Sequence, residues 1–112
     1  MKKTTINLEE HRTKGSKVFT GRDRGITVRE ETDIDNLNNE YDSIIIQIPK
    51  DIMSINPSFL EEFLTNVVNN LGKEKFYNKF SFESESSRYN IEIDLEEAVE
   101  RILRNENALT KR

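Results

Sequence analysis

The sequence predicts a single small α/β domain, with a mixed or largely parallel sheet of four to five strands and helices packed on it. Three observations predict this fold. Residues 43–48 form a continuous β-branched apolar run, residues 57–71 carry apolar side chains at helical spacing, and strand and helix patterns alternate along the chain. At 112 residues, the chain is long enough to bury a core without disulfides or metals.

The N-terminal third contains shorter patterns. Residues 4–8 alternate and are β-branched, which predicts a first strand, and residues 14–17 predict a turn around Gly15. Residues 26–32 fit a helix or a strand by pattern, and we expect a helix. Residues 33–42 are polar and predict a linker.

The run at residues 43–48 is apolar at nearly every position, which is typical of a parallel strand covered on both faces. Pro49 ends it, because proline has no N–H for the ladder. The helix that follows begins with Asn56 as N-cap and Pro57 at the first helical position. Gly72 suits its C-terminal end. Its predicted buried face comprises Leu60, Phe63, Leu64, Val67, Val68 and Leu71.

The last third predicts a short helical turn at residues 73–79 and a strand at residues 80–83, followed by a loop. Residues 89–93 also alternate, so they fit either a short hairpin partner or an extended approach to the last helix. Asp94 and Glu97 resemble a capping box at the start of that helix.

Three segments follow from these patterns. Residues 1–15 are predicted as an N-terminal strand and polar arm, residues 16–107 as the α/β domain, and residues 108–112 as a C-terminal tail.

The composition argues against several classes of function. The chain has no cysteine, and His11 is its one histidine, so thiolate catalysis, a cysteine zinc site and a histidine cluster are excluded. We expect no enzyme activity, cofactor or metal. No apolar stretch approaches the roughly 18 residues of a membrane span, and no signal-peptide pattern is present, so we expect a cytoplasmic protein.

The charge is unevenly distributed. The net charge is −4, which argues against general nucleic-acid binding. Residues 1–29 hold eight Lys or Arg against three Asp or Glu, and the rest holds nine against eighteen. Such asymmetry marks either an interaction surface or a charged arm that keeps the protein soluble.

Two segments are candidate sites. The first is an arginine loop that comprises Gly21, Arg22, Arg24, Gly25 and Arg29. Glycines let backbone N–H groups approach an anion, and arginines bind phosphate through paired hydrogen bonds. The alternative is structural: the arginines pair with acidic side chains or carbonyl groups of the same chain, and the glycines permit the turn.

The second segment is the entry to the long helix, where we expect a partner surface or a phosphorylation site. It comprises Ser54, Asn56, Ser58, Glu61 and Glu62. Functional groups gather at the carboxyl ends of strands in open α/β sheets, and a phosphate in the first turn of a helix is stabilised by the helix dipole. The alternative is a plain helix cap beside an exposed serine.

Together these segments resemble the STAS-like family of small bacterial proteins, distant relatives of the STAS domains of anti-sigma factor antagonists. The resemblance rests on residues 19–25 (FTGRDRG), the apolar strand 44–48 and the helix entry 55–59 (INPSF), and it covers roughly residues 16–105. In regulated antagonists a serine follows an aspartate at this helix start. Here Asn56 stands at the aspartate position and Pro57 at the acceptor position, so the phosphorylated serine has no direct counterpart.

The resemblance implies a non-catalytic regulatory module that binds a protein, with a histidine-kinase-type ATPase or a transcription regulator as the expected partner. A second hypothesis is a ligand-sensing module that binds a nucleotide or another anion at the arginine loop. The sequence leaves both hypotheses open.

Overall fold

A computed structural model of the chain describes residues 1–84 and 89–110, with side chains described for residues 1–84 and 89–105. In chain order the elements are β1 (Lys3–Asn7), the 3-10 turn η1 (Leu8–His11), β2 (Val18–Phe19), α1 (Arg22–Thr32), α2 (Ile34–Glu40), β3 (Ser43–Ile48), β4 (Ser54–Ile55), α3 (Pro57–Lys79), β5 (Phe80–Ser84) and α4 (Glu92–Thr110).

The main sheet has the strand order β1-β3-β5, and both of its pairings are parallel. Thr5 lies opposite Ile45, and Ile45 lies opposite Ser81. The predicted strands at the start of the chain, at residues 43–48 and after residue 80 are therefore confirmed. The strand β1 is part of the main sheet, because it pairs with β3 along its whole length.

A second sheet consists of only two short strands. β2 and β4 are parallel, with Val18 opposite Ser54 and Phe19 opposite Ile55. The described strands thus number five, but they form two sheets of three and two strands instead of the single sheet of four to five that the sequence predicted. A two-residue strand carries no readable alternation, which is why neither was predicted.

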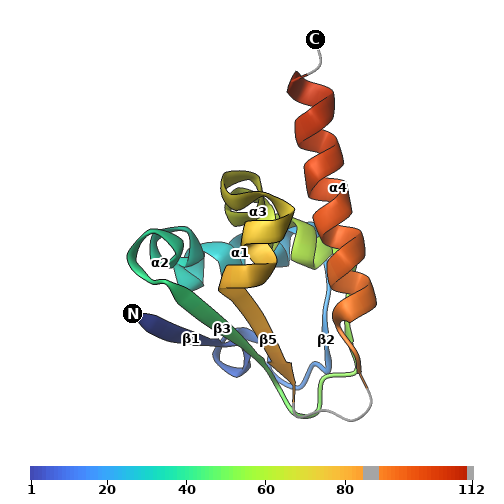
Figure 1. Cartoon of the computed structure of the whole chain (residues 1–112). Coiled ribbons are helices and arrows are strands. Elements are labelled where there is room, and N and C mark those ends of the chain that lie inside the picture. Colours follow the sequence, from blue (N-terminus) through green and yellow to red (C-terminus); the bar gives the residue numbers. More distant parts are fainter. Residues whose placement is uncertain (85–88, 111–112) are drawn as a thin grey trace.

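The main sheet is covered on one face only, so the expectation that β3 is covered on both faces was wrong. Ile44, Ile46 and Ile48 are buried, whereas Gln47 between them is exposed. Figure 1 shows α1, α2 and α3 on the same side of strands β1, β3 and β5. The side chains on the other face are mostly polar, which allows a parallel sheet to meet solvent there.

The helix of residues 57–71 is confirmed. The side chain of Asn56 accepts a hydrogen bond from the backbone N–H of Ser58 at 2.8 Å, as an N-cap does. Gly72 has φ 80°, which favours glycine, and it separates this helix from a second helical segment that carries the buried Phe76. The structure therefore also confirms the short turn predicted at residues 73–79.

Two predictions about helices were wrong. Residues 34–40 form α2 and not a linker, because Ile34 and Asn38 are both buried against the rest of the fold. The helix α4 begins at Glu92, where the side chain of Asn90 accepts a hydrogen bond from the Glu92 N–H at 2.9 Å. Asp94 therefore does not cap the helix, and it accepts a hydrogen bond from the Tyr89 hydroxyl at 2.7 Å.

The interior lies between the main sheet and the helices. The helix α3 contacts both α1 and α4, and it supplies the largest share of the buried side chains. Phe19, Phe59 and Phe63 form an aromatic row inside it, with ring centroids 5.1 and 5.9 Å apart. Figure 1 shows that the C-terminal part of α4 extends beyond the other elements. The predicted tail at residues 108–112 falls outside the residues whose side chains are described.

Candidate functional site

The arginine loop forms the start of α1 and packs against the first turns of α3. Gly21 is the N-cap of α1 with φ 93°, so it does permit the turn. Gly25 has a different role. A Cβ added there would lie 2.5 Å from the carbonyl oxygen of Phe59, so the glycine allows α1 and α3 to approach closely. The two sequence-predicted segments are therefore brought together, and we call their contact the α1–α3 junction.

The arginines of the junction are hydrogen-bonded within the chain. Arg29 Nη1 donates to the carbonyl oxygen of Glu62 at 2.7 Å, and Arg24 Nη2 donates to the carbonyl oxygen of His11. Arg22 Nη1 lies 3.3 Å from Glu62 Oε1. These contacts favour the structural interpretation of the loop, because each guanidinium group already binds an oxygen of the same chain.

Glu61 is the most buried charge of the junction, at 7% exposure. Its carboxylate lies 3.5 Å from Arg22 Nη1 and 3.8 Å from Arg101 Nη1, and Asn105 Nδ2 donates to it at 3.5 Å. It therefore links α1, α3 and α4. Because this carboxylate is buried and already contacts other side chains of the chain, it is not available to a partner protein.

The helix entry is more accessible. Ser54 and Asn56 are exposed, and the Ser58 hydroxyl donates to Asn56 Oδ1 at 2.7 Å. The hydroxyl of the half-buried Tyr89, which donates to Asp94, also lies 3.2 Å from the Ile55 carbonyl oxygen and so holds the start of α4 close to β4. Burial, with the neighbouring Asp94 carboxylate, raises the pKa of Tyr89, so its hydroxyl stays protonated and able to donate.

Two exposed apolar side chains lie beside the helix entry. Val18 is 42% exposed and Met53 is 53% exposed. They belong to the two chains of the small sheet: Val18 lies opposite Ser54, and Met53 directly precedes β4, where its N–H donates to the Lys17 carbonyl oxygen at 2.8 Å. We call Val18, Met53, Ser54 and Ser58 the helix-entry surface.

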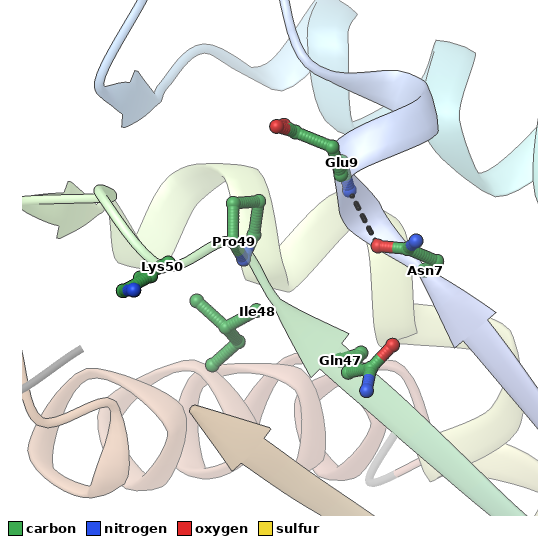
Figure 2. A pocket seen from close by; sticks show the side chains of 6 residues that line it. All are labelled: Asn7, Glu9, Gln47, Ile48, Pro49 and Lys50. Carbon is green, nitrogen blue, oxygen red and sulfur yellow. Dashed lines mark hydrogen bonds between the residues drawn. The ribbon is translucent and has the colours of Figure 1, made fainter. Parts of the chain in front are cut away.

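A separate hollow lies at the carboxyl ends of β1 and β3. Its volume is about 250 Å³, and its lining residues are Asn7, Glu9, Gln47, Ile48, Pro49 and Lys50. Figure 2 shows the side-chain amides of Asn7 and Gln47 on one side of it and Lys50 on the other. Asn7 Oδ1 accepts a hydrogen bond from the Glu9 N–H at 3.0 Å. We call this the amide hollow.

Glu9 also lines a second hollow, most of whose lining residues come from the loop after β1. Its volume is about 520 Å³, and it is lined by Glu9, Arg12, Lys14, Gly15, Lys17 and Asp51. We call it the lysine hollow. Arg12 is one of these lining residues, although its side chain is only 12% exposed. Arg12 Nη1 lies 2.6 Å from Asp51 and 2.9 Å from Glu9, and Arg12 Nε donates to the Ser16 carbonyl oxygen at 3.1 Å.

The Arg12–Asp51 pair shifts both partners toward their charged forms. The hydrogen bond from Arg12 lowers the pKa of Asp51, and the hydrogen bond to Asp51 raises the pKa of Arg12. Both charges of this pair are therefore present across the physiological pH range.

The sequence analysis did not select any residue of the two hollows. Their residues follow β1 and β3, and the carboxyl ends of parallel strands meet at one edge of a sheet. That rule could have indicated Lys14, Lys17 and Lys50, which follow the first and second predicted strands. We used that rule for the helix entry alone. The pairing of Arg12 with Asp51 joins residues 39 positions apart, so no local pattern predicts it.

Comparisons with protein-family models, with curated proteins and with solved structures find no match for this chain. The described residues contain no group of three or more His, Cys, Asp or Glu placed to hold a metal ion. Among them, no helix combines the length and apolar character that crossing a membrane requires.

Proposed function

We propose that the protein is a non-catalytic regulatory module that binds another protein through its helix-entry surface. The observation that supports this proposal best is the exposure of two apolar side chains at the small sheet, Val18 on β2 and Met53 directly before β4, close to the start of α3. Interface cores are depleted of charged residues and often contain methionine, whereas their rims are polar. The helix-entry surface has this composition.

The contacts of the arginines support this function over anion sensing at the arginine loop. An anion bound by Arg24 or Arg29 would have to compete with carbonyl oxygens that already accept hydrogen bonds from them. The resemblance to STAS-like proteins points in the same direction, toward a histidine-kinase-type ATPase or a transcription regulator as partner. It rests on the motifs at residues 19–25, 44–48 and 55–59.

Affinity capture from the source cells, followed by mass spectrometry, tests the proposal. We expect the wild-type protein to retain a partner that Met53→Glu and Val18→Glu both lose, because each places a charge in the apolar centre of the surface. Tyr77→Glu is the matched control, since Tyr77 is a similarly exposed apolar side chain on the second segment of α3. A partner retained by all three variants would show that the helix-entry surface is not the interface.

Ser58 provides a finer test on the same captured partner. Ser58→Asp adds a charge to the surface, and we expect it to weaken binding, whereas Ser58→Ala should leave binding unchanged. We expect no efficient phosphorylation of Ser58, because its hydroxyl is hydrogen-bonded to Asn56 and Glu62 lies in the same turn of α3. Stoichiometric phosphate on Ser58 in intact mass spectra would contradict this expectation.

A further inference from the structure

The strand-end region around both hollows is basic, although the protein as a whole is acidic. Its charged residues are Glu9, Arg12, Lys14, Lys17, Lys50 and Asp51, which give a local net charge of about +2 by formal charge against −4 for the chain. Arg12 contacts both Glu9 and Asp51 directly. In the part of the chain that the structure describes, Lys14, Lys17 and Lys50 form no ion pair.

The backbone of the lysine hollow is fixed without these lysines. Arg12 binds the carbonyl oxygen of Ser16, and the Ser16 N–H donates to the Thr13 carbonyl oxygen at 2.9 Å. Gly15 lies between them with φ 80°, and no atom lies within 4 Å of the place where its Cβ would stand. The loop therefore presents open backbone between two ammonium groups that form no ion pair among the described residues, and binding a ligand there would not require refolding it.

The amide hollow adds donors and acceptors without charge. The side chain of Gln47 has no hydrogen-bond partner among the described residues, and Asn7 uses only its oxygen, for the Glu9 N–H. Figure 2 shows both amides at the rim of the hollow. Glu9 lines both hollows, so they adjoin there. Ligands of open α/β sheets bind at this edge, where the strands end.

We propose that the strand-end region binds a small phosphorylated molecule. The phosphate lies in the lysine hollow, held by Lys14, Lys17 and the backbone at Gly15. The uncharged polar part of the molecule reaches the amides of Asn7 and Gln47 in the amide hollow. The volume of the lysine hollow, about 520 Å³, falls in the range of small-molecule sites. This site shares no residue with the arginine loop, and it does not depend on the proposed protein partner.

The test is a titration of the ¹⁵N-labelled full chain with pyrophosphate and with ATP at low ionic strength, followed by amide chemical shifts. We expect saturable shifts at Gly15, Ser16 and Lys17 with both probes. The double variant Lys14→Ala/Lys17→Ala should lose about tenfold or more in affinity, because each charge-assisted hydrogen bond contributes substantially to phosphate binding. The double variant should keep the wild-type fold, since the side chains of Lys14 and Lys17 are both exposed.

Lys75→Ala is the matched control. Lys75 is also exposed and without an ion pair among the described residues, but it precedes β5 and so lies near the opposite edge of the parallel sheet. The affinity of the Lys75→Ala variant for pyrophosphate should stay within about twofold of the wild-type value, the scatter expected for a surface substitution. Equal losses in the control and in the double variant, or shifts that do not saturate, would overturn the site.

Two further results test the details. Glu9→Gln removes a negative charge that lines both hollows, so we expect affinity for either probe to rise. Weaker binding by Glu9→Gln would contradict the electrostatic argument. ATP, unlike pyrophosphate, should also shift the side-chain NH₂ signals of Asn7 and Gln47. If ATP leaves both signals in place, the amide hollow is not part of the site.

Discussion

The α1–α3 junction and the strand-end region both concentrate charge, but they use it differently. At the junction, Arg22, Arg24 and Arg29 bind carboxylate or carbonyl oxygens of the same chain. At the strand ends, Arg12 alone forms ion pairs, while Lys14 and Lys17 have no ion-pair partner among the described residues. The guanidinium groups thus join elements of the fold, and the ammonium groups stay available.

The comparison shows that a cluster of cations in a sequence does not by itself indicate a binding site. The junction has the more conspicuous motif, with two glycines around two arginines. Its contacts join α1 to α3 and to η1 within the same chain. The strand-end lysines have an ordinary sequence context, and only the fold places them beside an open hollow. Substitutions in the two regions can separate the structural role of the first from the proposed binding role of the second.

The largest effect is expected inside α3, on which the junction is built. Phe63 is fully buried, and its ring lies 5.9 Å from that of Phe59. Phe63→Ala should lower the free energy of unfolding by about 3–5 kcal/mol, because it removes a buried aromatic side chain and leaves a cavity. Urea unfolding measures this. Tyr77→Ala, at a position of α3 that is 39% exposed, should cost less, and an unchanged midpoint for Phe63→Ala would show that Phe63 is not in the core.

The glycines of the two regions give a direct comparison. At Gly25 a Cβ would lie 2.5 Å from the Phe59 carbonyl oxygen and 2.9 Å from Glu62 Cβ, so Gly25→Ala must separate α1 from α3. We expect a loss of about 1–3 kcal/mol, as for other overpacked sites. The clash should therefore outweigh the roughly 1 kcal/mol by which alanine stabilises a helix relative to glycine.

Gly15 is the control, because its Cβ would meet no atom within 4 Å. Gly15→Ala should cost about 1 kcal/mol from its positive φ alone. It should leave α1 and α3 undisturbed in amide chemical shifts. If Gly25→Ala were as stable as the wild type, the two helices would not be in close contact at Gly25.

The cations of the two regions differ in the same way. Arg29→Met should lower the free energy of unfolding by about 1–2 kcal/mol, because it removes the charge-assisted hydrogen bond to the Glu62 carbonyl oxygen. Lys17→Met should change it by less than about 0.5 kcal/mol, as for most surface substitutions. Urea unfolding of both variants tests the pair, and similar losses for the two would remove the distinction between the regions.

The sequence predicted the elements of the fold whose patterns are long. Residues 57–71 repeat their apolar positions over four turns and have a cap at each end, so α3 was identified from Asn56 to Gly72. The helix α2 was missed because most of its residues are polar, and its two buried positions, Ile34 and Asn38, do not form an apolar helical pattern. Whether a strand is covered on one face or two depends on helices elsewhere in the chain, so the exposure of Gln47 could not be read locally.

The candidate sites were predicted less well, for a physical reason. Residues 21–25 and 58–62 were each selected for their local chemistry, but only the close approach at Gly25 reveals that they bind each other. The hollows at the strand ends combine residues from two parallel strands and the loops after them. The Arg12–Asp51 contact that joins these loops has no signal in the order of the residues.

The smallest effect concerns that contact and depends on pH. Since Arg12 holds the pKa of Asp51 below its usual value, the contact stabilises the folded chain fully above the pKa of an unfolded aspartate, about 3.9. The stabilisation is lost as the pH falls through the lower pKa of the folded state. Thermal unfolding from pH 7 to pH 2 should therefore show Asp51→Asn melting below the wild type at neutral pH, with a difference that fades in acid. A difference that stays constant over this range would mean that the Asp51 carboxylate does not stabilise the strand-end region through its charge.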